Sequence, residues 1–322
     1  MIRISLIIAT YNRAAQLIAA LESVVRQDLP AAEWECIVVD NRSADDTAER
    51  FAAFAAAHPA CRLRRVYEEQ PGLSHARNRG IAEAQGALIA FIDDDEWIEP
   101  QWLRAYVELF DRHPEVQAAG GPIVAEYPEG RPAWLSHYPE SAIANVMDFG
   151  PKERLFPAGR IPGGGNMAFR REVFAAGGGF DIRFGRVGQS LTGGEESELF
   201  ERLRMQGCRP WYAPGAVMHH VTPASKLTES YFRRLCRNMG IDQQQRARLQ
   251  NRLVRARFGE VLKWGATLLL CCTMRPVQAR WLLRMRREIS TGIFGKSEKN
   301  GKAVREKRSY LPGTTNSTSR KR

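Results

Sequence analysis

Residues 87–95 (ALIAFIDDD) join a run of six apolar residues to three consecutive carboxylates. An uninterrupted apolar run of this length is typical of a strand that is buried on both faces of a parallel sheet. Ligands of open α/β sheets bind beyond the carboxyl ends of such strands, which is where Asp93, Asp94 and Asp95 fall. Three adjacent charges repel one another, and Mg²⁺ held by carboxylates commonly bridges to a phosphate. The stretch therefore predicts a metal-bound phosphate ester, with a solvated acidic turn before a helix at Pro100 as the alternative.

The segments around this strand alternate in type. Apolar runs predict further strands at residues 4–9, 35–39 and 62–67, and helical spacing predicts helices over residues 14–27, 43–57 and 73–84. A β-α-β-α-β-α-β order requires parallel strands with right-handed crossovers. We therefore expect a mostly parallel central sheet flanked by helices.

The pattern changes after residue 115. Residues 117–125 are strand-like, and residues 126–162 are rich in Pro and aromatic residues without a clear period, which favours a long functional loop. A helix is predicted from Arg171, another over 192–206, and a last strand over 211–221.

Charge divides the chain into two parts. The formal net charge is +11, but residues 231–322 hold 23 Lys and Arg against 5 Asp and Glu, which leaves residues 1–230 with −7. We therefore expect a catalytic domain over 1–230, a basic helical region over 231–295 and a disordered basic tail over 296–322. Nucleic-acid binding is not expected, because no recognition motif accompanies the charge.

Compartment signals favour the cytoplasm. The six cysteines show neither CxxC nor zinc-ligand spacing, as expected of reduced cysteines. Residues 4–9 are too short for the apolar part of a secretory signal, and the longest later apolar stretch, 264–274, is about half a membrane span.

Polar residues cluster where the predicted strands end. Neither GxGxxG nor GxxxxGK[ST] is present, which weakens dinucleotide-binding and NTPase interpretations. Asp40 could accept from the N–H of a pyrimidine ring on which Tyr11 stacks. Each of these residues has an alternative role as a cap or turn residue. The candidates for binding a nucleotide are Thr10, Tyr11, Asn12, Arg13, Asp40, Arg77 and Asn78.

The ordered set of motifs resembles the family 2 glycosyltransferases with the GT-A fold. The motifs are SLIIATYNR, VVDNRSADDT, PGLSHARNRG, FIDDDEW, GGGNMAFRREVF, GGFD and TGGEESELFERL, and they cover roughly residues 2–240. The resemblance implies that Asp40 reads uracil and that Asp93 and Asp95 form a D-x-D metal motif, with Asp95 the direct ligand of Mg²⁺ or Mn²⁺. It also implies that the segment Gly164, Gly165 and Asn166 faces the donor sugar and the acceptor.

The catalytic base of this family lies in a Glu-Asp pair, which reads Glu195-Glu196 here. Thr192 and Glu195 have the spacing of a capping box, so Glu195 could be occupied with the helix N-terminus. Glu196 takes the aspartate position and is the preferred base. Its extra methylene displaces the carboxylate by roughly a bond length, so the base must act mainly through its position.

Two further residues are carried over from the family. The resemblance implies that a histidine of the pair His219-His220, with His219 the better match, contacts the metal or the diphosphate, and packing at a strand end is the alternative role for either one. Lys226 stands where relatives have an arginine near the leaving diphosphate. The resemblance further implies a single displacement that inverts the anomeric configuration.

Residues 231–295 interleave arginines with Leu, Val, Trp and Met. This composition is typical of amphipathic helices that bind an anionic membrane leaflet, with Trp264 and Trp281 at the headgroup level. A solvated helical subdomain packed on the catalytic domain is the alternative.

Together these features predict an inverting glycosyltransferase at the cytoplasmic membrane face. It would transfer sugar from a UDP-sugar to a lipid-linked or oligosaccharide acceptor in bacterial cell-surface polysaccharide synthesis. The alternatives are a non-catalytic sugar-nucleotide-binding scaffold and a nucleotidyltransferase. The second alternative lacks a basic Gly-rich loop, because residues 9–15 offer only Arg13.

Overall fold

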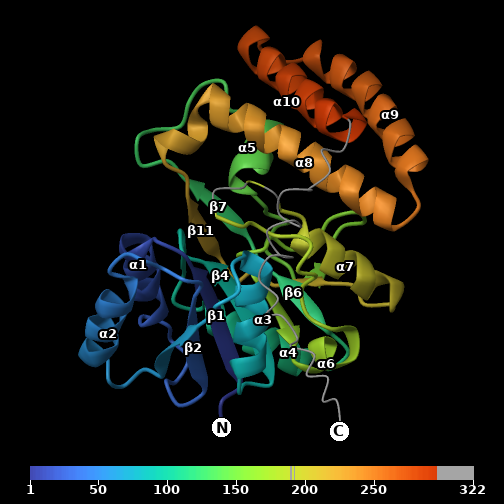
Figure 1. The fold of residues 1–322 in the computed structure, drawn as a ribbon. Coiled ribbons are helices and arrows are strands. Elements are labelled where there is room, and N and C mark those ends of the chain that lie inside the picture. Colours follow the sequence, from blue (N-terminus) through green and yellow to red (C-terminus); the bar gives the residue numbers. More distant parts are fainter. Residues whose placement is uncertain (189–190, 192, 296–322) are drawn as a thin grey trace, which may run out of the picture.

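Strand β4 (Leu88–Asp93) lies inside an eight-stranded sheet in this computed structural model, which describes residues 1–188, 191 and 193–295. The strand order is β3-β2-β1-β4-β9-β6-β10-β8 (Figure 1). The other strands of this sheet are β1 (Ile4–Thr10), β2 (Trp34–Asp40), β3 (Leu63–Tyr67), β6 (Ala118–Gly120), β8 (Arg154–Leu155), β9 (Met167–Arg170) and β10 (Trp211–Tyr212).

The sheet is parallel in its amino-terminal half and mixed in the other half. Strand β1 pairs in parallel with β2 and β4, whereas β9 is antiparallel to both β4 and β6. The predicted parallel β-α-β order is therefore confirmed for β1 to β4. The register sets Thr10 beside Asp40 and Ala9 beside Asp93, so the polar ends of three strands meet at one edge.

Helices cover both faces of the sheet (Figure 1). Even-numbered residues of β1, such as Leu6 and Ile8, pack with one set of helices, and Ile7 packs with the other, because successive side chains of a strand point to opposite faces. The first set is α1 (Ala14–Val24), α2 (Thr47–Ala57) and α4 (Trp102–Arg112). The second is α3 (Leu73–Glu83), α6 (Glu172–Gly177) and α7 (Glu195–Met205).

A small second sheet interrupts two of the predicted strands. It consists of β5 (Glu96–Ile98), β11 (Met218–Val221) and β7 (Ile123–Glu126). The predicted strand 117–125 divides into β6 and β7 around Gly121-Pro122, and the predicted strand 211–221 divides into β10 and β11. The predicted loop 126–162 was only partly correct, because it contains β8 and helix α5 (His137–Ala144).

The carboxyl-terminal part forms a helical lobe, which we define as α5, α8 (Glu229–Leu249), α9 (Leu253–Cys271) and α10 (Pro276–Phe294). A short 3₁₀ turn, η1 (Ala224–Leu227), leads into it. The lobe has its own apolar core, to which α5, α8 and α10 contribute. The predicted boundary at residue 231 therefore leaves out α5. This helix packs in the lobe although it ends 85 residues before α8 begins. The predicted disordered tail lies outside the described residues.

Of the two tryptophans expected at a membrane surface, Trp281 lies in the core of the lobe, so that expectation was wrong for Trp281. Trp281 is 9% exposed and stacks on Trp134 at 3.9 Å between ring centroids. The indole N–H of Trp264 donates to Ser290 Oγ at 2.9 Å. Trp264 is half-buried, so its place at the headgroup level stays a prediction.

Glycines allow α8 and α10 to pack backbone to backbone. A Cβ at Gly240 would collide with the carbonyl oxygen of Ile289, and a Cβ at Gly292 would collide with that of Arg237. We expect Gly240→Ala to lower the free energy of unfolding by about 1–3 kcal/mol, because over-packing forces backbones apart. Equilibrium urea unfolding measures this change.

Gly259→Ala in α9 is the matched control, because a Cβ at Gly259 meets nothing within 4 Å. Alanine in an open helical position should raise stability by about 0.5–1 kcal/mol. Equal effects of the two substitutions would contradict the close helix packing.

Candidate active site

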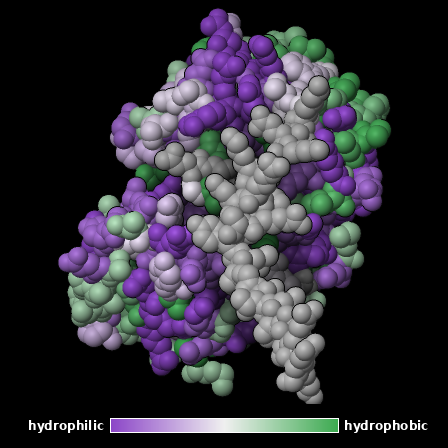
Figure 2. All heavy atoms as spheres, in the orientation of Figure 1, coloured by the Kyte–Doolittle hydropathy of each residue, from purple (hydrophilic) through white to green (hydrophobic). Residues whose placement is uncertain are grey.

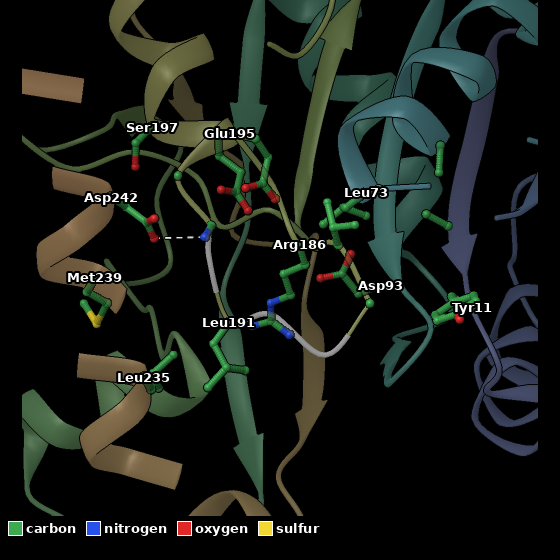
Figure 3. A pocket seen from close by; sticks show the side chains of 18 of the residues that line it. Tyr11, Leu73, Asp93, Arg186, Leu191, Glu195, Ser197, Leu235, Met239 and Asp242 are labelled. Atoms are coloured by element: carbon green, nitrogen blue, oxygen red, sulfur yellow. Dashed lines mark hydrogen bonds between the residues drawn. The ribbon is translucent and has the colours of Figure 1, made fainter. Parts of the chain in front are cut away.

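A cleft of about 990 Å³ opens where the sheet edge, the start of α7 and helix α8 meet. In Figure 3, Tyr11 and Asp93 lie on one side of it and Met239 and Asp242 on the other, with Arg186 between them. The volume is at the upper end of the roughly 300–1,000 Å³ typical of ligand sites. The cleft is therefore large enough for more than one substrate.

Cations from two distant segments neutralise the carboxylates that follow β4. Asp94 accepts from the Thr10 hydroxyl at 2.8 Å and from Arg13 at 2.9 Å, yet burial raises the pKa of Asp94 to about 6. Asp95 accepts from Lys226 at 2.6 Å. Although burial alone would raise it, the pKa of Asp95 is held well below its ordinary value by Lys226 and His220.

A further acid, which sequence reasoning missed, lies behind this group. Glu96 is 6% exposed and accepts the backbone N–H of Asp93 at 2.8 Å. Burial, together with the charges of Asp93 and Asp95, raises the pKa of Glu96 well above its ordinary value. A Cβ at Gly165 would collide with the Glu96 carboxyl group, so this position admits only glycine without rearrangement.

Arg77 of α3 joins the carboxylates of β4 to those of α7. Its guanidinium is buried, and it donates to Asp93 at 3.0 Å and to Glu195 at 3.1 Å, with Glu196 at 3.6 Å. It also donates to the Gly164 carbonyl at 3.2 Å. Burial opposes the charge, but the three carboxylates raise the pKa of Arg77 above its ordinary value. Arg77 therefore serves as an internal counter-ion, and it is not part of the cleft wall where a base or ribose would bind.

The two adjacent glutamates differ in environment. Burial and repulsion from Glu196, opposed by Arg77, raise the pKa of Glu195 to about 8. The Glu195 side chain is 3% exposed, whereas that of Glu196 is 23% exposed. Helix α7 begins at Glu195 with Gly194 as its N-cap and no side-chain cap, and Thr192, the other half of the predicted capping box, lies outside the described residues. Glu195 is occupied by Arg77 instead.

Of the two adjacent histidines, His220 rather than His219, which was preferred for the metal, lies toward Asp95. His219 stacks on Trp97 at 3.6 Å between ring centroids, and its Nε2 lies 3.0 Å from Glu99. Alternation along β11 turns His220 the other way, so that its Nε2 lies 3.2 Å from Lys226 Nζ. Burial, followed by the charge of Lys226, lowers the pKa of His220.

The residues around Asp95 suit a divalent cation. The Lys226 ammonium already lies between Asp95 Oδ2 and His220 Nε2, and it stands in for a cation on oxygen and imidazole ligands. Within residues 1–188, 191 and 193–295, no three His, Cys, Asp or Glu side chains are gathered closely enough to hold a metal by themselves. A metal here would therefore depend on displacement of Lys226 and on oxygens from a substrate.

Several predicted nucleotide-binding residues have their side chains engaged elsewhere. Asp40 accepts from the backbone N–H of Ser43 and from Arg65, both at 2.8 Å, and is not part of the cleft wall. Asn78 bonds both polar groups of the Phe180 backbone, so the prediction for it was wrong.

Two further asparagines also have structural roles. Asn12 accepts from the backbone N–H of Ala44 and ties two loops together. Asn166 is fully buried, and its amide accepts from Trp102 and Tyr106 and donates to two backbone carbonyls. The expectation that Asn166 faces the donor sugar was therefore wrong.

The cleft wall includes predicted and unpredicted residues. The predicted residues that line it are Thr10, Tyr11, Arg13, Asp93, Asp94, Asp95, Glu195 and Glu196. Arg186, Asp242 and Arg246 also line it and were missed. A signal for Asp242 existed in the sequence, because residues 231–295 contain only three acidic residues among many arginines.

The fold and the facing carboxylates define a GT-A nucleotide-sugar transferase. The model of the family described as "Glycosyl transferase family 2" matches residues 5–178. Because this match covers more than half of the chain, the protein belongs to glycosyltransferase family 2, as the motifs predicted.

Named relatives agree with this assignment. The chain is 28% identical over 224 residues to the glucosyl-dolichyl phosphate glucuronosyltransferase of Haloferax volcanii, covering 68% of this chain and 69% of that protein. It is 30% identical over 180 residues to the putative glycosyltransferase EpsH of Bacillus subtilis, covering 54% of this chain and 48% of EpsH.

Solved structures share the fold. The mannosyltransferase PcManGT of Pyrobaculum calidifontis, in complex with GDP-Man and Mn²⁺, superposes with a TM-score of 0.58 at 20% identity and covers 92% of this chain and 88% of that one. TarS 1–349 of S. aureus, in complex with UDP-GlcNAc, gives 0.54 at 17% identity, covering 75% and 66%. At these identities the likeness concerns the fold alone.

The raised pKa of Glu195 predicts a pH-dependent stability. A carboxyl whose pKa rises on folding favours the folded state at low pH, and that advantage is lost between the ordinary value of 4.5 and about 8. Glu195→Gln should therefore lose roughly 3 kcal/mol less stability than the wild type between pH 5 and pH 8, because each unit of pKa corresponds to about 1.4 kcal/mol. Urea unfolding at several pH values measures the difference.

Glu201→Gln is the control, because Glu201 lies on the same helix and pairs with Arg252 at the surface. Its stability should follow the wild type at each pH, apart from a constant offset. If the stability of Glu195→Gln changed with pH in parallel with that of the wild type, the raised pKa of Glu195 would be contradicted.

Proposed function

We propose that this glycosyltransferase moves a sugar from a nucleotide donor, most simply a UDP-sugar, to an acceptor hydroxyl that Glu196 deprotonates. The observation that carries the proposal is the bridge made by Arg77, which holds the D-x-D end of β4 and the start of α7 in one cleft. Metal-binding carboxylates and a candidate base thus face the same substrate space. The second sequence-based alternative, a nucleotidyltransferase, finds no further support.

The donor is assigned to the sheet edge. Tyr11 is 45% exposed at the cleft and offers a face on which a base can stack. Arg13 lies beside Asp94 and Asp95, where diphosphate oxygens would need a positive partner. In our proposal a bound ligand releases Asp40 from Arg65, and Asp40 then accepts from the N–H of uracil.

Glu196 is the better base of the pair because of its accessibility. Glu195 is buried and bonded to Arg77, whereas Glu196 lines the cleft with a partly exposed carboxylate. A Cβ at Gly164 would collide with Glu196 Oε1, so the glycine leaves room for this carboxylate. A base within hydrogen-bond reach of the acceptor hydroxyl takes its proton as the new bond forms.

The remaining residues of the site would hold the metal ion and neutralise the charge of the diphosphate. Asp95, Asp93 and His220 would hold Mg²⁺ or Mn²⁺, which when bound supplies positive charge to the leaving diphosphate. Lys226 and Arg13 provide cationic groups beside the same carboxylates. Attack opposite the departing diphosphate inverts the anomeric configuration, as the family resemblance implies.

The setting follows from relatives whose names refer to glycan assembly. A dolichyl-phosphate-linked glucose is the acceptor in the name of the Haloferax enzyme, and succinoglycan biosynthesis appears in the name of ExoO of Rhizobium meliloti. We extend this to a role in cell-surface polysaccharide synthesis with a lipid-linked or oligosaccharide acceptor. A non-catalytic sugar-nucleotide-binding scaffold is the alternative that the following experiment addresses.

Nucleotide binding and turnover should separate in Glu196→Gln. In the wild type, UDP at about 100 times its dissociation constant with Mn²⁺ should add roughly 2.7 kcal/mol of stability, more than GDP, dTDP or CDP. Glu196→Gln should retain this shift but lose sugar transfer at least about 100-fold, because it cannot accept the proton. Thermal unfolding and UDP release from UDP-sugars measure the two properties.

Glu198→Gln is the matched control, since Glu198 pairs with Arg202 on the same helix and does not line the cleft. It should keep both properties. Unchanged turnover in Glu196→Gln would remove Glu196 as the base, and no shift with any nucleotide in the wild type would favour the scaffold.

We further propose that α9 docks this enzyme on the anionic cytoplasmic leaflet of a membrane. The helix turns its apolar side outward, since Glu260 and Thr267 are its buried residues, whereas Phe258 is 64% and Leu269 75% exposed. The exposed apolar side chains of α9 are Val254, Phe258, Val261, Leu262, Leu268 and Leu269. Figure 2 shows hydrophobic side chains along the outer edge of the molecule over α9.

Exposed cations flank this apolar side and favour a lipid occupant. They are Arg252, Arg255, Arg275 and Arg280. An apolar helix face bordered by Lys and Arg lies in the interface of anionic bilayers. Within the part of the chain that the structure describes, no helix is both long enough and apolar enough to cross a bilayer.

Phe258→Ser with Leu269→Ser should weaken binding to phosphatidylglycerol vesicles at least about tenfold, because each buried apolar side chain contributes about 1.5–3 kcal/mol. Vesicle co-sedimentation measures the change. Met205→Ser, an exposed apolar residue of α7, is the control and should bind as the wild type does. Equal binding by all three proteins, or a dimer in solution that loses its association in the double variant, would contradict membrane docking.

A further inference from the structure

Helix α8 presents one continuous face to the cleft. The residues on this face are Leu235, Met239, Asp242, Gln243 and Arg246. Their spacing places them on the same side of a helix. The helical lobe therefore builds the wall of the cleft that faces the sheet edge (Figure 3).

Asp242 is the unusual acid of the lobe. Glu260 pairs with Arg286 and Glu288 pairs with Arg233 and Arg237, whereas Asp242 has no salt bridge with any described residue. It is 5% exposed, and its Oδ2 accepts the backbone N–H of Gly193 at 2.9 Å.

The other oxygen of Asp242, Oδ1, has no hydrogen-bond partner among the described residues. Burial raises the pKa of Asp242 to about 6, against the N–H of Gly193 and the charge of Arg246. A buried polar atom without a partner costs about 1–3 kcal/mol, so a ligand that donates to Oδ1 would recover that energy.

Two guanidinium groups near Asp242 form no ion pair with any described residue. Arg246 follows Asp242 at the i,i+4 spacing that normally forms an ion pair, but no ion pair joins it to a described residue. Its Nη1 is turned instead toward Gly194 at the start of α7. Arg186 is exposed, and its backbone carbonyl accepts the N–H of Leu73 at 2.9 Å, which anchors it beside α3.

Arg186 likewise forms no ion pair with the residues the structure describes. Both arginines line the cleft, and both charges stabilise the carboxylate of Asp242. Two unpaired guanidiniums in a concave site are suited to a phosphate, which they bind through charge-assisted hydrogen bonds.

An apolar strip adjoins this polar group. Leu191, Leu235, Met239 and Ile289 line the same cleft. In Figure 3, Leu191, Leu235 and Met239 lie together on the α8 side of the cleft, next to Asp242. A ligand that follows this wall would carry a hydroxyl, an anion and an apolar group.

We propose that Arg186 and Arg246 bind a phosphate of the acceptor while Asp242 accepts a hydrogen bond from a hydroxyl of the same molecule. The acceptor is then a sugar joined through phosphate to a hydrocarbon chain, rather than a neutral oligosaccharide. Only the term "acceptor" rests on the proposed function; the ligand chemistry follows from these residues.

This site is separate from the place assigned to the donor phosphates. Arg13 and Lys226 are held at Asp94 and Asp95, beyond β4. Arg246 lies near Gly194 at the start of α7, on the side of the cleft where the charge of Glu196 also acts on Asp242. Because the base must touch the acceptor, groups on this side of Glu196 belong to the acceptor.

Farnesyl phosphate is the probe, with farnesol and inorganic pyrophosphate as partial ligands, and calorimetry on the full chain is the measurement. The wild type should bind farnesyl phosphate at least about tenfold more tightly than Arg246→Gln, since a charge-assisted bond contributes about 1.5–3 kcal/mol. Arg246→Lys should recover part of the affinity. UDP with Mn²⁺ should bind Arg246→Gln and the wild type equally.

Arg248→Gln is the matched control, because Arg248 is exposed on the same helix and is not part of the cleft wall. It should bind the probe as the wild type does. Arg186→Gln provides a second variant outside the lobe, with the same expected loss, in case Arg246→Gln unfolds.

Equal affinity of the wild type, Arg246→Gln and Arg186→Gln for farnesyl phosphate would overturn the site. An equal loss in Arg248→Gln would reveal general charge attraction and overturn it as well. If Arg246→Gln lost UDP affinity, Arg246 would serve the donor. Pyrophosphate binding as tightly as farnesyl phosphate would overturn the hydrocarbon part. Farnesyl phosphate binding by a wild type that fails to bind any nucleotide would support the site and refute the proposed function.

Discussion

The buried guanidinium of Arg77 is the interaction on which the site depends. It holds Asp93 at the end of β4, Glu195 at the start of α7 and the Gly164 carbonyl before β9. A buried charge is tolerated only with compensating partners, and the buried carboxylate of Glu195 would be costly without the cation. Three segments that are distant in the sequence therefore assemble together, and the carboxylates that the chemistry requires stay close despite their repulsion.

The helical lobe is part of the site as well as an appendage to it. Its α8 wall closes the cleft opposite the sheet edge, and Asp242 fastens the segment before α7 by accepting from Gly193. The glycine contacts between α8 and α10 keep this wall against the lobe core, while α9 turns its apolar side away from the protein. One lobe thus joins the wall of the cleft to a candidate membrane surface, which would suit an acceptor that is held in a bilayer.

The sequence predicted those parts of the fold that local patterns encode. Apolar runs ending in polar residues located β1, β2 and β4, because a parallel strand must be buried along its whole length and must expose its ends. Prediction from the sequence failed where the partner of a side chain belongs to a distant segment of the chain. Asn78, Asn166 and His219 match family positions, but backbone groups and aromatic rings from other segments engage them, and α5 belongs to the lobe only through packing.

By itself, the sequence determined the family, the GT-A fold, the edge of the sheet at which the candidate site lies, and five of its carboxylates, namely Asp93, Asp94, Asp95, Glu195 and Glu196. These follow from strand periodicity and from motifs that are contiguous along the chain. The tertiary structure alone decided that Arg77 faces carboxylates, that His220 rather than His219 neighbours Asp95, and that Asp242, Arg246 and Arg186 complete the cleft. The physical reason is that burial and charge pairing depend on distances between segments, and no local pattern of residues records those distances.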